Sequence, residues 1–359
     1  MKAKLLPALA AGLVTGAAQA QAPAAKAPAA PPIEVRLSGQ INRAIMHVDD
    51  GAEKEWFNVD NGNSSTRFRF NAEGKVTETQ KAGILFEVEY KSNPSSDVTF
   101  ADRDRAASLN ERHMDLFYAS TWGTLRLGQG DGAANGASEV DLSGTTVAHY
   151  ASTPDIGGAF EYRSNGLLSG ASIAGTLSNQ DFESRYDRVL YQTPSMSGFT
   201  VEGSWGNKES TIYELALRYS GKLGGLGTLA AALGYSTEEG AGGAADDKIM
   251  GGSISWLHTS GINLTYSHTN RELPGRDGKF DYFKLGYKFS SLHAVSIDYG
   301  MGQDQLAGGD EATMFGIGYV LTPVAWAEVF ALAKQHSLDR SGGSLDDITF
   351  FMVGSRIKF

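Results

Sequence analysis

The chain has 359 residues, a formal net charge of −10 and no cysteine. Its acidic balance argues against a nucleic-acid partner, which requires a basic surface. The absence of cysteine excludes disulfide bonds, thiol catalysis and zinc sites built on cysteine.

The N-terminal segment has the features of a secretory signal peptide over residues 1–20. Lys2 and Lys4 precede a short apolar stretch, and Ala18-Gln19-Ala20 matches the small-residue pattern of a cleavage site. Residues 21–32 consist almost entirely of alanine and proline, which indicates a linker without core-forming side chains. We therefore predict that ordered protein begins near Ile33.

From residue 34 onward the sequence alternates between apolar and polar residues, the period-two pattern of β-strands. In residues 66–76, for example, Phe68 and Phe70 share one face while Arg67 and Arg69 share the other. The first five predicted strands span residues 33–47, 66–76, 81–91, 112–119 and 124–128, and eleven more follow between 187 and 359. No segment after residue 20 holds the roughly 18 apolar residues that a membrane helix needs.

The connections between these strands alternate in length. Short links such as 77–80, 259–260 and 290–291 alternate with longer polar segments such as 49–64, 93–111 and 303–311. This asymmetry is typical of transmembrane β-barrels of the outer membrane, in contrast to soluble β-sandwiches. The final strand supports the same interpretation, because it carries Phe351, Val353 and Ile357 on one face and ends on Phe359. Such a strand is suited to close a ring against the first strand and to leave no free edge.

Residues 129–186 form the longest connection, between the fifth and sixth predicted strands. Residues 159–163 and 171–178 within it are short strand-like stretches, so eighteen strands are the alternative to sixteen. We favour sixteen, because these stretches lack the bulky apolar face of the others. A connection of this length needs a functional reason, and a place inside a hydrated lumen supplies one. The predicted fold is an all-β transmembrane antiparallel barrel of sixteen strands, residues 33–359, with a long inward-folded loop after strand 5.

The sequence resembles the Gram-negative general porin family over residues 33–359. The likeness rests on GTLRLGQ at 123–129, EVDLSGT at 139–145, DRVLYQTPSMSGF at 187–199 and the terminal Phe359. The resemblance implies a homotrimeric outer-membrane channel for passive diffusion of small hydrophilic solutes and ions. It also implies that acidic residues of the long loop face basic residues of the wall and narrow the pore.

Carried onto this sequence, the resemblance gives a candidate pore constriction of eight residues. The wall candidates are Arg36, Arg67, Arg69 and Arg126, the loop candidates are Asp131, Glu139, Asp141 and Asp155, and Arg188 is a weaker wall candidate. Opposed charges across a narrow pore create a transverse field that favours polar solutes and tunes ion selectivity. The alternative is that some of these charges only solvate the lumen or form pairs that hold the loop.

Two other functions stay under consideration. The long loop also suits a substrate-selective channel for sugars or organic anions. A hydrolase carried on a barrel is the other, with Ser143, His149 and Asp155 as a catalytic set, although we predict no enzyme. No cofactor or metal site is predicted, because the histidines are scattered, and Ala133 and Leu142 stand where an EF-hand needs oxygen ligands. The expected partners are outer-membrane lipid and lipopolysaccharide, further copies of the chain and small solutes.

Overall fold

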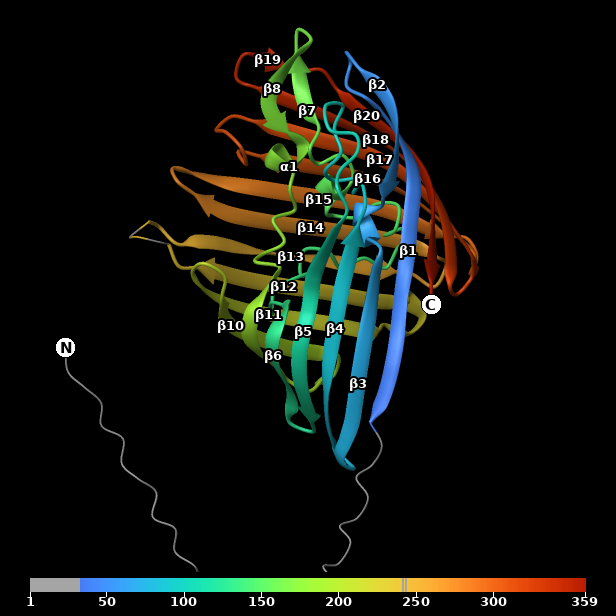
Figure 1. Ribbon diagram of the computed structural model, residues 1–359, viewed down its shortest axis with the longest axis vertical. Coiled ribbons are helices and arrows are strands. Elements are labelled where there is room, and N and C mark those ends of the chain that lie inside the picture. The colour runs from blue at the N-terminus through green and yellow to red at the C-terminus, as the bar shows by residue number, and fades with distance from the viewer. Residues whose placement is uncertain (1–32, 241, 243) are drawn as a thin grey trace, which may run out of the picture. The chain divides into compact units, whose positions relative to one another are not determined.

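A computed structural model describes residues 33–240, 242 and 244–359. The predicted signal peptide and the Ala/Pro-rich linker lie outside the described residues. One antiparallel sheet of eighteen strands dominates the unit formed by residues 33–359 (Figure 1). Two of these strands, β2 (Lys54–Asp60) and β19 (Gly343–Ser344), pair only with a neighbouring hairpin partner. The other sixteen form a closed ring, which confirms the predicted barrel and its strand count.

The ring strands follow one another in chain order. They are β1 (Glu34–Asp49), β3 (Arg67–Thr77), β4 (Gln80–Lys91), β5 (Ser108–Ser120), β6 (Gly123–Asp131), β9 (Arg185–Gln192), β10 (Phe199–Asn207), β11 (Thr211–Lys222), β12 (Thr228–Glu238), β13 (Asp247–Leu257), β14 (Ile262–Leu273), β15 (Arg276–Lys288), β16 (His293–Gln303), β17 (Glu311–Val324), β18 (Ala327–Arg340) and β20 (Ile348–Lys358). Short helical segments lie at η1 (Gly62–Ser64), η2 (Thr153–Asp155), α1 (Ile173–Thr176) and η3 (Gly224–Leu226). Among the described residues, no helix is long and apolar enough to cross a membrane.

Strand β1 closes the ring because it joins the second strand of the ring, β3, to the last one, β20. Its first half pairs with β3, and its second half pairs with β20. Phe359 completes the seam, since its backbone N–H donates to the Gly39 carbonyl at 3.0 Å and its carbonyl accepts from the Gly39 N–H at 2.9 Å. The predicted closure of the last strand on the first is therefore confirmed.

The outward face of the ring is apolar, as the period-two pattern predicts. On β15, for example, Phe283 and Leu285 are exposed while Lys284 between them is buried. An apolar outer band on tilted strands is what a hydrocarbon environment requires. Because the ring has no open edge, every barrel strand finds backbone partners within the protein.

Two local predictions need correction. The segment 49–64, predicted as a loop, contains β2, which pairs with β1 from Asp49 opposite Lys54 to Arg43 opposite Asp60. The polar and glycine residues before β2 form only a tight turn, and its alternation is too short to be distinguished from a loop by sequence. The long connection contains a separate hairpin, β7 (Glu161–Ser164) and β8 (Leu167–Ser172), that does not join the ring. The strand-like stretch 159–163 overlaps β7, whereas the stretch 171–178 contains only the end of β8 and the short helix α1.

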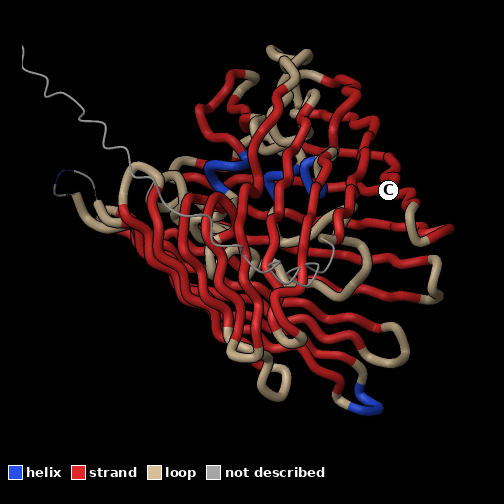
Figure 2. The backbone as a smooth tube through the Cα atoms, turned by 60° about the horizontal axis from the view of Figure 1, so that its bottom comes forward, coloured by secondary structure: helices blue, strands red, loops and turns tan. Residues whose placement is uncertain are grey.

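The interior is apolar on one side. There the segment 132–184, which we call the inner loop, packs against the inward faces of β1, β2, β15, β17, β18 and β20. Figure 2 shows loop and short helical segments inside the ring of strands. The ring of Phe160 in this loop lies 5.7 Å from that of Phe57, 5.1 Å from Phe100 and 5.7 Å from Phe350. The loop is therefore docked through a hydrophobic core, whereas the sequence suggested a chain lying in hydrated lumen. The polar site lies on the remaining side.

Candidate pore constriction

The inner loop follows the inner wall of the barrel and is attached to it by short hydroxyl side chains. Successive inward residues of the wall bond to successive loop residues, which fixes the path of the loop. The contacts are the Ala133 N–H to Ser204 Oγ (2.8 Å), the Val140 N–H to Ser253 Oγ (2.8 Å), the Leu142 N–H to Ser255 Oγ (2.9 Å) and Thr145 Oγ1 with Ser296 Oγ (2.7 Å). Serine and threonine suit this role because a small hydroxyl lets backbone approach the strand closely.

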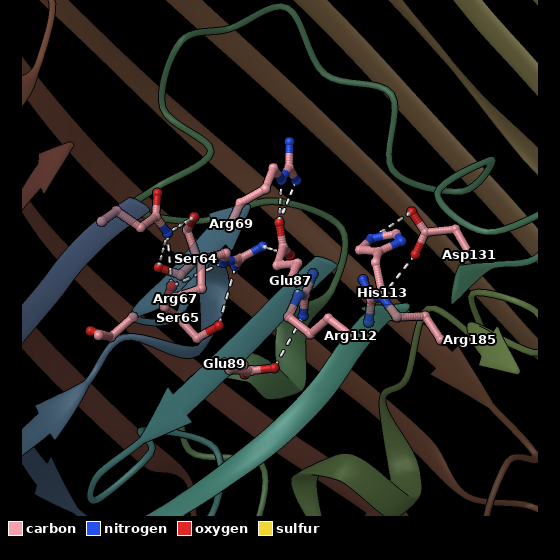
Figure 3. Close-up of polar contacts among 12 residues, drawn as sticks. Ser64, Ser65, Arg67, Arg69, Glu87, Glu89, Arg112, His113, Asp131 and Arg185 are labelled. Carbon is pink, nitrogen blue, oxygen red and sulfur yellow. Dashed lines mark hydrogen bonds and ion pairs between the residues drawn. The ribbon is translucent and has the colours of Figure 1, made fainter. Parts of the chain in front are cut away.

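Strands β3, β4 and β5 present a ladder of alternating charges to the lumen (Figure 3). Arg69 lies opposite Glu87 in the β3–β4 register and donates to it at 2.6 Å. Arg112 on β5 reaches the same carboxylate at 2.7 Å and also Glu89 at 3.1 Å. Arg67 lies 3.7 Å from Glu87 and donates to the Ser65 carbonyl at 3.1 Å. The two buried carboxylates hold three guanidinium groups in a fixed row.

A second set of charges continues this row onto β6 and β9. The Asp131 carboxylate forms an ion pair with Arg185 at 2.8 Å and lies 3.7 Å from His113 (Figure 3). Asp115 receives both Nη atoms of Arg188, at 2.9 and 3.0 Å, and Arg126 at 3.2 Å. The basic side chains therefore continue along the wall from β3 to β9, and we call them the arginine row: Arg67 and Arg69 on β3, Arg112 on β5, Arg126 on β6, and Arg185 and Arg188 on β9.

The inner loop presents three carboxylates whose hydrogen-bond donors are neutral groups. Glu139 accepts from the Asn179 amide at 2.8 Å, and Asp155 accepts from the Tyr150 hydroxyl at 2.7 Å. Asp181 accepts from the Gly136 N–H and from the Ser138 hydroxyl, both at 2.6 Å. These bonds position the carboxylates and leave their charge uncompensated by an adjacent cation.

One cavity of about 530 Å³ is lined both by basic residues of the wall and by the carboxylates of the inner loop. Its lining includes Arg67, Lys91, Arg112 and Arg185 from the wall together with Glu139, Tyr150, Asp155 and Asp181 from the inner loop. A second cavity, of about 370 Å³, is lined by Arg69, His113, Arg126, Asp131, Arg188 and Arg218 among others. Asn135 lines both cavities, so they meet at this point of the loop.

Burial shifts the protonation of the loop carboxylates. It raises the pKa of Asp155 to about 6, against the opposing effect of the Tyr150 hydrogen bond. It also raises the pKa of Glu139 well above its usual value, and the nearby carboxylates of Asp181 and Asp155 add to this shift. Both effects follow from placing like charges in a confined site inside the barrel.

The structure assembles most of the predicted site residues. Arg67, Glu139 and Asp155 line the first cavity, and Arg69, Arg126, Asp131 and Arg188 line the second.

Two predicted site residues lie elsewhere. Arg36 is exposed near the start of β1, paired with Glu34 at 2.6 Å, and lines neither cavity. Asp141 is buried in an ion pair with Lys284 at 2.7 Å, so its charge is neutralised at the wall and does not face the pore. It acts as an attachment of the loop, the alternative that the sequence left open.

Sequence reasoning missed Arg112, Arg185 and Asp181. The β4–β5 pairing has a β-bulge at Glu87 and Val88, and this bulge changes which residues near the start of β5 point inward. Arg112 therefore points into the lumen. Asp181 and Arg185 lie close to the end of the long connection, where no alternation of residues predicts which side chains point into the lumen. The only available signal was their charge next to the start of β9.

The catalytic set considered for a hydrolase does not assemble. Ser143 Oγ bonds to Thr145 Oγ1 at 2.9 Å, and Asp155 bonds to Tyr150. His149 instead contacts Ser296 and Asp298, and its side chain is fully buried. Within the described residues, no group of three or more histidine, aspartate or glutamate residues could hold a metal ion.

Comparisons with known proteins agree with this architecture. The model of a family described as Gram-negative porin matches residues 8–321. An anion-selective porin from Comamonas acidovorans superposes with a TM-score of 0.66 at 19% identity, covering 91% of this chain and 100% of that chain. OmpT of Vibrio cholerae in a trimer form gives 0.59 at 14% identity, covering 91% and 99%. The channel DcaP of Acinetobacter baumannii gives 0.56 at 13%, covering 91% and 97%. No curated protein sequence matches the chain significantly.

Proposed function

Because the chain belongs to the Gram-negative porin family and forms a diffusion channel in the outer membrane, we propose that its selectivity is set between the arginine row and the inner-loop carboxylates. The observation that carries this proposal is the lining of the cavity of about 530 Å³, with Arg67 and Arg112 from the wall and Glu139 and Asp181 from the loop. Opposed charges in a space of low dielectric create a strong transverse field. Small polar solutes and ions pass such a field more readily than apolar molecules.

We propose a weak preference for anions, including small organic anions. All the guanidinium groups keep their charge at any physiological pH, whereas burial raises the pKa of Glu139 and raises that of Asp155 to about 6, which disfavours the charged form of both carboxylates. The second cavity adds Arg69, Arg126 and Arg218 on the same path. The solved porin from Comamonas acidovorans is itself named anion-selective. A selective organic-anion channel is the second candidate, favoured by this basic second cavity.

Reversal potentials in a salt gradient test the proposed site. Arg67→Ala and Arg112→Ala should move the potential toward cation preference, and Glu139→Gln and Asp181→Asn should move it toward anion preference. Arg36→Ala is the matched control, because that arginine lies outside both cavities and should leave the potential unchanged. If the four site variants keep the parental potential, selectivity is set elsewhere. A competing organic anion such as succinate separates the two candidates, since only a selective channel is blocked by it.

We infer that the protein has no hydrolytic role, which is supported by the buried state of His149 and by the separate bonding of Ser143 and Asp155. Purified protein should release no product from esters or peptides beyond the rate seen with the His149→Ala variant. Product formation that this variant abolishes would contradict the inference.

We also propose that the channel is a homotrimer whose outer band contacts membrane lipid and lipopolysaccharide. The proposal is supported by the broad apolar outer face and by the trimer form of the similar Vibrio cholerae protein. Light scattering in detergent should give three times the mass of the mature chain. A monomer that conducts normally would contradict the assembly without affecting the proposed selectivity site.

A further inference from the structure

One short stretch of the inner loop lies inside the ring between β16 and the segment after β2, and it is held from both sides. We call residues 145–150 the strut. At one end, Thr145 Oγ1 lies 2.7 Å from Ser296 Oγ on β16. On its other side, the side-chain amides of Asn61 and Asn63, which follow β2, donate to the Val147 and Ala148 carbonyls at 2.8 and 2.6 Å. The strut therefore spans from β16 to the segment after β2, inside the ring.

The wall contact of the strut is centred on His149. Its Nε2 lies 3.0 Å from Ser296 Oγ, and its Nδ1 lies 2.5 Å from an oxygen of Asp298. Lys284 donates to the His149 carbonyl at 2.7 Å, so side chain and backbone are both held. None of the His149 side chain is exposed.

The barrel wall is shaped to receive this imidazole. Gly316 and Gly318 occupy successive inward positions of β17, and a Cβ atom at Gly318 would overlap His149 Nε2 and Cδ2. A Cβ atom at Gly316 would overlap a carboxylate oxygen of Asp298. Neither glycine has a positive φ, so the chain conformation does not demand glycine at these positions. Their role is to leave space, and we call this space, with Ser296 and Asp298, the His149 niche.

The niche is connected to the constriction by a single peptide bond. Tyr150, the next residue, turns to the cavity of about 530 Å³, which it lines together with Thr146 of the strut. The Tyr150 hydroxyl in turn donates to Asp155 at 2.7 Å. A displacement of His149 from the wall must therefore displace Tyr150 and the acidic side of the constriction.

We propose that insertion of His149 into its niche sets the width of the pore. This inference rests on the proposed location of the constriction and assigns its positioning to His149, Gly316 and Gly318, none of which lines the cavity. With the imidazole seated, the strut is held across the lumen and Tyr150 narrows the passage. Without it, the strut loses its side-chain contacts with Ser296 Oγ and Asp298 and is held to the wall only by the Thr145 hydroxyl and by the Lys284 bond to the carbonyl of residue 149. The hydrophobic core around Phe160 still retains the loop inside the barrel.

Two variants unseat the imidazole in different ways. His149→Ala removes it, and Gly318→Ala fills the space it occupies. Both should show a larger single-channel conductance and faster liposome swelling with a sugar that the parent channel retards. Gly203→Ala is the matched control, because a Cβ atom there meets only the Glu214 carbonyl, at 3.9 Å. Measurements are made on protein that migrates as a folded barrel in unheated detergent gels. Should Gly318→Ala not assemble, His149→Ala decides, since it adds no atoms.

A disulfide between the strut and β17 tests whether the attachment of the strut to the wall, rather than a change in packing, sets the width of the pore. A Cβ atom at Gly318 would lie 3.2 Å from Ala148 Cβ, so a small outward shift of the strut brings the two atoms to the roughly 3.5–4.5 Å that a disulfide spans. The chain has no cysteine of its own. In an Ala148→Cys, Gly318→Cys variant, the niche is blocked but the strut can be tethered covalently. The oxidised channel should show the parental conductance and the reduced channel the larger one.

The outcomes distinguish this inference from the function on which it rests. If the niche proposal alone is wrong, His149→Ala and Gly318→Ala keep the parental conductance, while Arg67→Ala and Glu139→Gln still shift the reversal potential. If the constriction lies elsewhere, the charge variants leave the reversal potential unchanged whatever the niche variants do. Equal conductance of the oxidised and reduced double-cysteine channel also overturns the niche proposal.

Discussion

At the scale of single residues, the inner-loop carboxylates give the channel a pH dependence. Burial raises the pKa of Asp155 to about 6, and burial with the adjacent carboxylates raises the pKa of Glu139. Both groups therefore take up protons as the pH falls through their raised pKa values. The arginines opposite them stay charged over this range. The balance of charge in the constriction becomes more positive in mild acid.

We expect the preference for anions to increase as the pH falls from about 7 to about 5, the range in which Asp155, with its pKa raised to about 6, takes up its proton. Reversal potentials measured in a salt gradient at successive pH values report the change. Asp155→Asn should reduce the size of the step, because this variant carries no titrating group at that position. A reversal potential independent of pH over this range would show that these carboxylates do not face the permeating ions.

The sequence predicts the residue types of the site better than their partners. Glu139 and Asp141 are two positions apart on an irregular segment, and both were candidates for the pore. Only Glu139 lines the cavity. Asp141 instead pairs with Lys284, which follows 143 residues later in the chain. No local pattern reveals a contact at that separation. Arg67 and Arg69 were predictable because a regular strand fixes their inward direction.

At the scale of elements, the inner loop behaves as a folded insert with a core of its own. Phe160 is almost fully buried, and its ring meets Phe57 on β2, Phe100 in the segment after β4 and Phe350 on β20. These contacts join the loop to one strand of the wall and to two segments outside the ring of strands. Their loss should loosen the loop while the strand-to-strand hydrogen bonds of the barrel remain.

We expect Phe160→Ala to destabilise the docked loop by about 3–5 kcal/mol, the usual cost of truncating a buried phenylalanine. Hydrogen exchange should show faster exchange across residues 156–182 and little change in the barrel strands. Phe315→Ala, which truncates an exposed outward aromatic on β17, is the control. Faster exchange throughout the barrel in Phe160→Ala would indicate that the loop and the wall unfold together, contrary to this account.

Strand alternation predicted the sixteen ring strands, because each has one face in the membrane and one face inward. It failed for β2, whose seven residues give too short an alternation next to a turn rich in polar residues. Alternation by itself does not show that the inward residues Phe350 and Met352 of β20 are buried under the loop. The apolar residues on both faces of β20 are a separate signal, which indicates a second covering layer.

At the scale of the whole molecule, the barrel depends on the seam between β1 and β20. Phe359 bonds to both backbone groups of Gly39, and its ring occupies the space that a Cβ atom at Gly39 would need. Deletion of Phe359 removes these bonds at the last step of ring closure. We expect export to be intact and the yield of folded barrel in the outer membrane to fall, as measured by mobility in unheated detergent gels.

Phe289→Ala is the control for this deletion, because it removes an exposed aromatic from the turn after β15 and leaves the seam unchanged. A normal yield of folded barrel without Phe359 would show that closure does not depend on the terminal residue. The closed ring was predictable from the alternation and from the last strand. The filling of one side of the lumen was not, because it arises from contacts between segments far apart in the chain.

Water and solutes cross this barrel, on the proposed function, through a passage narrowed between the arginine row and the inner loop. Single-channel recording of the purified protein in planar bilayers, with neutral sugars of increasing size added, tests this proposal most directly. We expect discrete conductance steps that are insensitive to sugars too large to enter and are reduced by those small enough to occupy the narrowed passage. Absence of steps, or reduction by large sugars as in an unobstructed sixteen-strand ring, would contradict the account.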